Sequence, residues 1–89
     1  MRFLFTMNMP SRNGHAVHQV IGAHESRDLA ELLTNIAKSD FITVEEFYVD
    51  RDSNGQSKLV SVGTVALNPM FIGKIKVSED QPPRRGPSR

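Results

Sequence analysis

The chain has 89 residues, of which 38% are hydrophobic and 24% charged, and it contains no cysteine. This length fits a single domain, and this composition is typical of a globular chain rather than a disordered or fibrous one. The absence of cysteine excludes disulfides, thiolate metal ligands and thiol catalysis. Because a core of this size is marginal, we expect a well-packed monomer, an oligomer or a complex with a partner.

The net charge of +1 conceals a segregation along the sequence. Residues 1–24 carry a net charge of +2, residues 25–52 a net charge of −5, and residues 53–89 a net charge of +4. Such a split can steer a partner or bring copies of a protein together, although solvated faces also produce it.

The N-terminal stretch MRFLFTMNMP has one arginine and a short apolar run. It lacks the long apolar core and the small-residue cleavage pattern of a signal peptide. No segment approaches the roughly 18 apolar residues that cross a bilayer. The sequence therefore predicts a soluble, cytoplasmic protein without a membrane partner, and the lack of cysteine fits a reducing compartment.

Residues 1–9 alternate in the manner of a half-buried strand. One face of this strand is apolar and carries Met1, Phe3, Phe5, Met7 and Met9. The SRNG segment at 11–14 is typical of a turn, because Asn13-Gly14 tolerates positive φ. HAVHQVIGAH at 15–24 alternates again, so the sequence predicts a hairpin of two strands.

One helix is predicted after the hairpin. Ser26 is the expected N-cap, with Asp28 in the first turn, where a carboxylate meets the positive end of the helix dipole. Lys38 suits the C-terminal turn. Apolar residues recur at helical spacing at Leu29, Leu32, Leu33 and Ile36. Since nothing else could bury this stripe, we expect the helix to cover a sheet.

The next segment, FITVEEFYV at 41–49, is rich in β-branched and aromatic residues and is predicted to be a strand. Its alternation slips at Glu45-Glu46. A β-bulge at this pair of glutamates would restore a single inward face to the strand.

Two further strands are predicted at 58–67 and 71–77. Asn68-Pro69 separates them, because proline supplies no hydrogen-bond donor to the ladder. Residues 78–89 lack any period and hold three of the five prolines, so we expect a disordered Pro/Arg-rich tail.

The predicted element order is ββαβββ in a single α+β domain over residues 1–77. We expect an antiparallel sheet of about five strands with the helix packed on one face. The alternative is a small barrel closed by a tight turn at Asn68-Pro69, whose final strands are similar to those of Sm-like and SH3-like barrels.

All three histidines lie in one stretch, at His15, His18 and His24. If the stretch from Ala16 to Ala23 is extended, the first two side chains face opposite sides of the strand. The last two then share a side but lie roughly 20 Å apart. Zinc needs its ligands about 2 Å from one point. The sequence therefore predicts no metal site, and it shows no catalytic constellation and no need for a cofactor.

Glu45 and Glu46 suggest a paired acid and base. Adjacent residues of a strand point to opposite faces, however, and cannot jointly flank a substrate. Tyr48 shares the face of Glu46 and would extend a polar patch there. We predict that these three residues form a solvated face that can take part in a protein interface.

The main evidence for a function comes from the apolar residues. The methionines and phenylalanines of the first strand, with those after the Asn-Pro turn, exceed what one short helix must cover. Methionine-rich surfaces also repack readily around partners. The alternative is that all of them form the core. The residues that we predict as an apolar protein interface are Met7, Met9, Met70 and Phe71.

Nucleic-acid binding is a second class of function, and it would use the basic end of the chain. Lys74 and Lys76 share one face of the last strand, and the tail adds Arg84, Arg85 and Arg89. A basic arm can contact phosphates without fixed geometry. Against this function, the chain has no tryptophan and one tyrosine for stacking on bases.

The sequence favours a small non-enzymatic protein-binding module of the adaptor or inhibitor type. It would self-associate through a sheet edge or through the methionine-phenylalanine face. A compact, cysteine-free chain of this size also suits a phage or mobile-element protein that blocks a host factor. Nucleic-acid binding through the basic strand and tail is the alternative.

Overall fold

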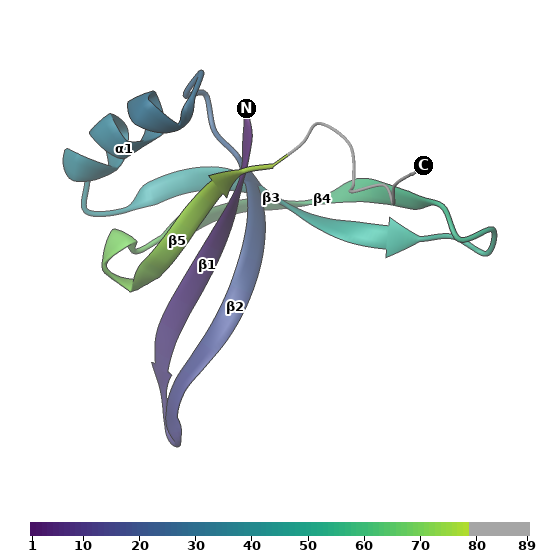
Figure 1. Cartoon of the computed structure of the whole chain (residues 1–89), viewed down its shortest axis with the longest axis horizontal. Coiled ribbons are helices and arrows are strands. Elements are labelled where there is room, and N and C mark those ends of the chain that lie inside the picture. The colour runs from purple at the N-terminus through teal and green to yellow at the C-terminus, as the bar shows by residue number, and fades with distance from the viewer. Residues whose placement is uncertain (79–89) are drawn as a thin grey trace.

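The computed structural model describes residues 1–78. Its elements are β1 (Arg2–Ser11), β2 (Gly14–Ala23), α1 (Leu29–Ala37), β3 (Ile42–Arg51), β4 (Ser57–Leu67), the short 3-10 helix η1 (Pro69–Phe71) and β5 (Ile72–Val77). The strands form one open antiparallel sheet in the order β4-β3-β2-β1-β5, with α1 beside it (Figure 1). The predicted α+β architecture is confirmed. The predicted tail lies outside the described residues except for Ser78, whose N–H donates to the carbonyl of Arg2 at 2.9 Å.

The sheet is curled, because a short connection joins its two edge strands. β4 ends at Leu67 and β5 begins at Ile72, yet three strands lie between them in the sheet. Four steps between strands measure about 19 Å across a flat sheet. The connection includes a 3-10 turn and spans only about 14 Å. The edges must therefore approach each other at this end, although β4 and β5 do not pair over residues 1–78 and the predicted alternative, a closed barrel, is not formed.

The core lies between α1 and the inward face of the sheet. Its buried apolar residues are Phe3, Phe5, Met7, Leu32, Ile42, Val44 and Leu67. They come from β1, α1, β3 and the end of β4. In β1 the predicted alternation is confirmed, since Phe3 and Phe5 are fully buried while Leu4 between them is half-buried.

α1 begins two residues later than predicted. Its N-cap is Asp28, whose carboxylate accepts a hydrogen bond from the N–H of Glu31 at 2.8 Å. The Glu31 carboxylate in turn accepts from the N–H of Arg27 at 2.6 Å. This reciprocal pattern resembles a capping box and satisfies donors that the first helical turn leaves without partners. The prediction of Ser26 as the N-cap is wrong, because that side chain is buried and bonds elsewhere.

The β-bulge predicted in β3 lies instead in β4. Glu46 pairs with Gly63 and Phe47 pairs with Ser61, so Val62 is the extra residue on the β4 side. Gly63 has a φ of +112°, a conformation that glycine adopts without the strain that a Cβ would bring. β3 therefore keeps its alternation, and β4 absorbs the irregularity.

As a consequence, the two halves of β3 present their apolar side chains to opposite faces of the sheet. Phe47 and Val49 lie on the face away from α1, so the predicted single inward face is wrong. Phe47 pairs with Ile21, which pairs with Leu4, and all three are half-buried. The guanidinium carbon of Arg2 lies 5.9 Å from the centroid of the Phe47 ring, within cation–π range. These side chains form a small second cluster on the outer face.

The two hairpins diverge from the centre of the sheet. β2 and β3 pair over three residues, Ile21 to Ala23 on β2, and β5 accompanies β1 only as far as Met7. Beyond these points β1–β2 and β3–β4 continue as two-stranded ribbons in different directions (Figure 1). The radius of gyration is accordingly 14.3 Å, against about 12 Å for a compact chain of this length.

Gly22 tests how closely β2 approaches β3 and the core. A Cβ at this position would lie 2.6 Å from Cγ2 of Val44 and 3.2 Å from the Phe5 ring. We expect Gly22→Ala to lower the free energy of unfolding by about 1–3 kcal/mol through overpacking, as measured by urea denaturation. Gly73→Ala is the control, because its Cβ would meet only the Thr6 carbonyl at 3.6 Å. Equal stabilities of the two variants would contradict the close approach.

Candidate functional site

An apolar pocket of about 380 Å³ opens at the end of the molecule where the sheet edges approach. Its lining residues are Met7, Met9, His18, Val20, Phe41, Ala66, Leu67, Asn68 and Phe71. They come from β1, β2, the end of β4, η1 and the residue that precedes β3. The volume falls within the range of about 300–1,000 Å³ that is usual for binding pockets.

The floor of the pocket is continuous with the core. Met7 and Leu67 are 4% and 6% exposed, and Met9 and Val20 are half-buried and pack against the same core. These residues hold their positions because they already belong to the packed interior. The pocket is therefore a preformed opening in the core, and an apolar group that enters it extends the core.

Two phenylalanines from different turns form the walls. Phe41 follows α1 and is 56% exposed. Phe71 belongs to η1, where its N–H donates to the Asn68 carbonyl at 3.0 Å. The Asn68 side chain caps the same turn by accepting from the N–H of Met70 at 3.0 Å. Asn68 thus positions the Phe71 wall through two hydrogen bonds.

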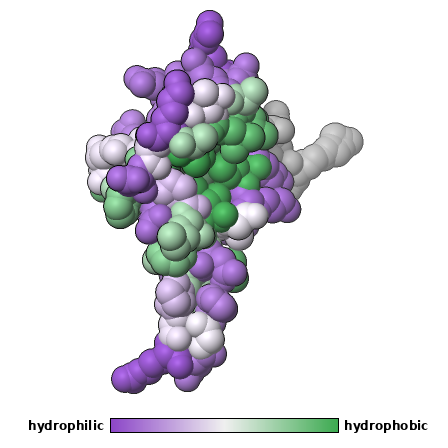
Figure 2. Space-filling view, turned by 90° about the vertical axis from the view of Figure 1, so that its left-hand side faces the viewer, coloured by the Kyte–Doolittle hydropathy of each residue, from purple (hydrophilic) through white to green (hydrophobic). Residues whose placement is uncertain are grey.

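Exposed apolar side chains also occur on η1 and α1. Met70 is 80% exposed beside the Phe71 wall, and Leu33 on α1 is 49% exposed. Figure 2 views the molecule from the side on which α1 and η1 lie, and it shows apolar side chains gathered in one patch with polar side chains around it. Contiguous apolar patches of this kind mark interaction sites in soluble proteins.

The structure brings together part of the predicted apolar interface. Met9 and Phe71 line the pocket, whereas Met70 lines a separate pocket on the other side of Phe71, together with Pro10 and His15. Met7 also lines the pocket, but it is a buried core residue and forms floor rather than surface. The sequence did not single out Phe41, because the curl of the sheet is what brings it into the same pocket as Phe71.

The predicted polar patch lies elsewhere. Glu45 is exposed and accepts a hydrogen bond from the Ser61 hydroxyl at 2.7 Å, while Glu46 is half-buried opposite Gly22. Tyr48 is 48% exposed on the β3–β4 ribbon. None of the three lines the apolar pocket.

The three histidines have three different environments. The stretch from Ala16 to Ala23 is extended within β2, as predicted. His15 and His18 are exposed on opposite faces of the strand, and His18 lies at the pocket. Over residues 1–78 the structure shows no group of three or more histidine, aspartate or glutamate side chains that could hold a metal ion.

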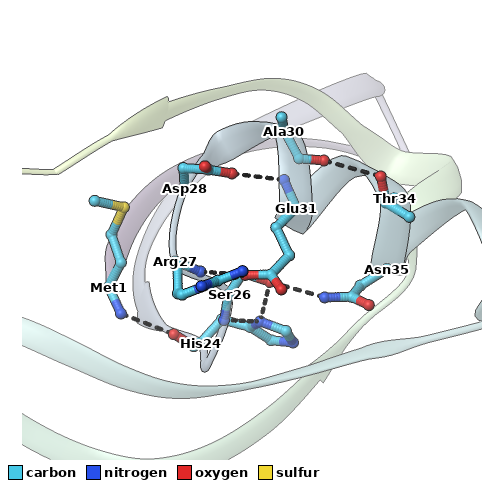
Figure 3. A network of polar contacts seen from close by, with 9 residues as sticks. All are labelled: Met1, His24, Ser26, Arg27, Asp28, Ala30, Glu31, Thr34 and Asn35. Carbon is cyan, nitrogen blue, oxygen red and sulfur yellow. Dashed lines mark hydrogen bonds and ion pairs between the residues drawn. The ribbon is translucent and has the colours of Figure 1, made fainter.

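His24 is half-buried and belongs to a polar network that joins β2 to α1 (Figure 3). Its Nδ1 accepts from the N–H of Ser26 at 3.0 Å and lies 2.8 Å from the Ser26 hydroxyl. That hydroxyl accepts from the Asn35 side chain at 2.9 Å, and it donates to Nδ1, because a nitrogen that accepts from the Ser26 N–H carries no proton. The N-terminal ammonium of Met1 donates to the His24 carbonyl at 2.8 Å. Because Ser26 is 1% exposed, its hydroxyl is closed to a substrate, and we assign the network a structural role.

Because of the strand order, the basic and acidic segments of the sequence lie in two different halves of the molecule. The basic half comprises β5, β1 and β2 with their connections (residues 1–23 and 68–78), and it carries Arg2, Arg12, Lys74 and Lys76 without a carboxylate. The acidic half comprises residues 24–67, including α1, β3 and β4, and has a net charge of −4. The pocket takes residues from both halves and therefore lies at the seam between them.

The predicted nucleic-acid residues divide between the basic half and the tail. Lys74 and Lys76 are exposed opposite Thr6 and Leu4, on the face of the sheet away from α1. The remaining predicted residues, Arg84, Arg85 and Arg89, lie outside the described residues.

Ser26 offers a test of the structural network. Ser26→Ala removes the acceptor of the half-buried Asn35 side chain and one of the two contacts of His24 Nδ1, so we expect the free energy of unfolding in urea to fall by about 1–3 kcal/mol. Ser53→Ala, at an exposed position in the β3–β4 turn, should change stability by less than about 0.5 kcal/mol. An unchanged stability of the Ser26 variant would show that the network does not hold β2 to α1.

Comparison of the chain with protein-family models, with curated proteins and with solved structures gives no match. Among the described residues no helix has the length and hydropathy needed to span a membrane.

Proposed function

We propose that this chain is a small non-enzymatic protein-binding module, and that the apolar pocket at the seam of its two halves receives an apolar side chain of the partner. The observation that carries the proposal is a preformed pocket whose floor belongs to the core and whose rim is apolar and exposed. Pockets of this kind accept apolar anchor residues of a partner, and the contacts around the anchor exclude water.

The magnitudes favour a protein partner over a small molecule. Burying one leucine or phenylalanine side chain contributes about 1.5–3 kcal/mol, which is roughly 10- to 150-fold in affinity. Such a gain is too small to overcome the cost of association by itself. Phe41, which lines the pocket and is 56% exposed, adds apolar area that a partner with a broader surface can cover.

The two edge strands of the sheet, β4 and β5, are less suitable than the pocket as binding sites for a partner. Along β4 the bulge at Val62 interrupts the regular ladder, and along β5 two lysines, Lys74 and Lys76, alternate with apolar residues. Bulges and edge lysines are the features by which natural sheets resist the addition of another strand. The pocket is therefore a better docking site than either edge.

A peptide library displayed on phage and selected on the folded chain tests this function. We expect enrichment of peptides with a large apolar anchor. The bound peptide should shift the methyl NMR signals of Met7 and Met9, which line the pocket, and leave that of Met1, before the start of β1, unchanged.

Phe41→Asp places a charge in the pocket wall and should weaken the selected peptide by about tenfold or more. Val62→Asp is the matched control, because Val62 is 54% exposed on the β4 side of the distant ribbon. Binding that survives Phe41→Asp, or that shifts Met1 alone, would place the binding site elsewhere and refute the proposal.

One observation also favours the second candidate, nucleic-acid binding: the basic half carries no carboxylate. On this proposal a labelled single-stranded oligonucleotide binds at low salt, weakens steeply as salt rises, and is lost when Lys74 and Lys76 are both replaced by glutamate. Fluorescence anisotropy measures the effect. Equal binding by the double variant would eliminate this candidate.

A further inference from the structure

We propose that the outer face of the sheet, the face away from α1, binds a single-stranded nucleic acid and receives one unpaired base in a second pocket beside η1. The inference rests on the second candidate function, because it specifies the strand form and the place of contact for nucleic-acid binding. It does not involve the apolar pocket. Three features carry it: a separate pocket with polar and apolar lining, an exposed methionine at its wall, and cationic side chains on both sides of it.

The second pocket has a volume of about 420 Å³ and lies where β5 separates from β1. β5 pairs with β1 only as far as Met7, so the residues that follow on β1 have η1 beside them. Asn8 and His15 form the polar part of the lining, and Met70 and Phe71 belong to the apolar part. Asn8 lies on the outer face, because it alternates with the inward-facing Met7. Phe71 lines both pockets and separates them.

This lining has the groups that bind an unpaired base. Asn8 and His15 are exposed, and within residues 1–78 neither side chain makes a hydrogen bond to another residue, so both are available to the polar edge of a base. Met70 is 80% exposed, the largest exposure among the large apolar residues of the described chain. Its unbranched thioether can close over an aromatic ring, and contacts between sulfur and such rings are favourable. Bases within a duplex are paired and stacked, so the pocket selects a single strand.

Cationic side chains lie on both sides of this pocket. Lys74 follows the lining residues of β5 directly, and Lys76 shares the outer face with it. Arg12 lies in the β1–β2 turn, beyond the lining residues of these two strands. Residues 1–23 and 68–78 contain no carboxylate side chain that would repel a phosphate. A strand whose base enters the pocket therefore has cations for the phosphates that precede and follow that base.

The outer face beside Lys74 offers contacts for the neighbouring bases. Thr6 and Gln19 lie abreast of Lys74 on β1 and β2 and supply hydrogen-bonding side chains. The second cluster lies on the same face, with the Arg2 guanidinium carbon 5.9 Å from the centroid of the Phe47 ring. Guanidinium planes and aromatic rings both stack on bases of single strands.

Fluorescence anisotropy of the whole chain with short labelled single strands, as DNA and as RNA, and with a duplex of the same sequence tests this inference. We expect the single strands to bind more tightly than the duplex. Met70→Asp should weaken the single strands by about tenfold or more, because the inserted base loses its cover and a carboxylate approaches the phosphates. Since Met70 is exposed, this variant should retain the circular dichroism of the parent chain.

Lys74→Ala tests the phosphate contact separately. It should weaken all single strands alike and make the slope of log K against log salt concentration shallower by about 0.7, the effect of one lost phosphate contact on a single strand.

Leu33→Asp is the matched control. It introduces the same charge at an apolar position that is 49% exposed, but on α1 and therefore away from the outer face. It should leave the affinity for single strands unchanged.

The outcomes separate this inference from the functions proposed above. Single strands that bind through Lys74 but bind Met70→Asp as tightly as the parent chain retain the second candidate function and overturn the inserted base. A duplex that binds as tightly as the single strands has the same consequence, and so does an equal loss of affinity in Leu33→Asp. If no strand binds at low salt, the inference and the second candidate both fail, while peptide binding at the apolar pocket is decided by its own test.

Discussion

The short connection between β4 and β5 is the constraint on which the rest of the structure depends. Five steps along the chain, including the η1 turn, join strands that stand at opposite edges of a five-stranded sheet. A flat sheet would hold them farther apart than the connection can reach. The sheet curls, its edges approach, and the inward face becomes concave. α1 closes part of this concavity and the apolar pocket remains at the open end.

The core and the pocket are consequently parts of one apolar interior. Met7 and Leu67 belong to the packed residues and also line the opening. The walls of the pocket, Phe41 and Phe71, come from turns rather than from the sheet. A partner that places an apolar side chain in the pocket would complete an interior that the chain leaves open. This is how a small domain with a marginal core can gain stability from association.

The bulge in β4 and the bonded turn before α1 illustrate how much depends on contacts distant in sequence. The slip of alternation in β3 indicated a bulge, but the extra residue, Val62, belongs to the neighbouring strand, where Gly63 accommodates the backbone. Likewise Ser26 has the chemistry of an N-cap. His24 and Asn35 engage its hydroxyl instead, and Asp28 caps the helix. Local sequence shows which residues could occupy a position such as the N-cap. Tertiary contacts determine which of these residues does so.

The sequence by itself determined the element order, the apolar face of the first strand, the single helix and the separation of charge, because each depends on periodicity and composition over neighbouring residues. It also identified Met9, Met70 and Phe71 as a group, from their residue types. Only the tertiary structure decided that Met7 is buried, that Phe41 faces the same pocket as Phe71, and that basic and acidic segments become two halves with a seam between them. These properties depend on the strand order and on the curl of the sheet. Both arise from contacts between residues far apart in the chain, so no local sequence pattern predicts them.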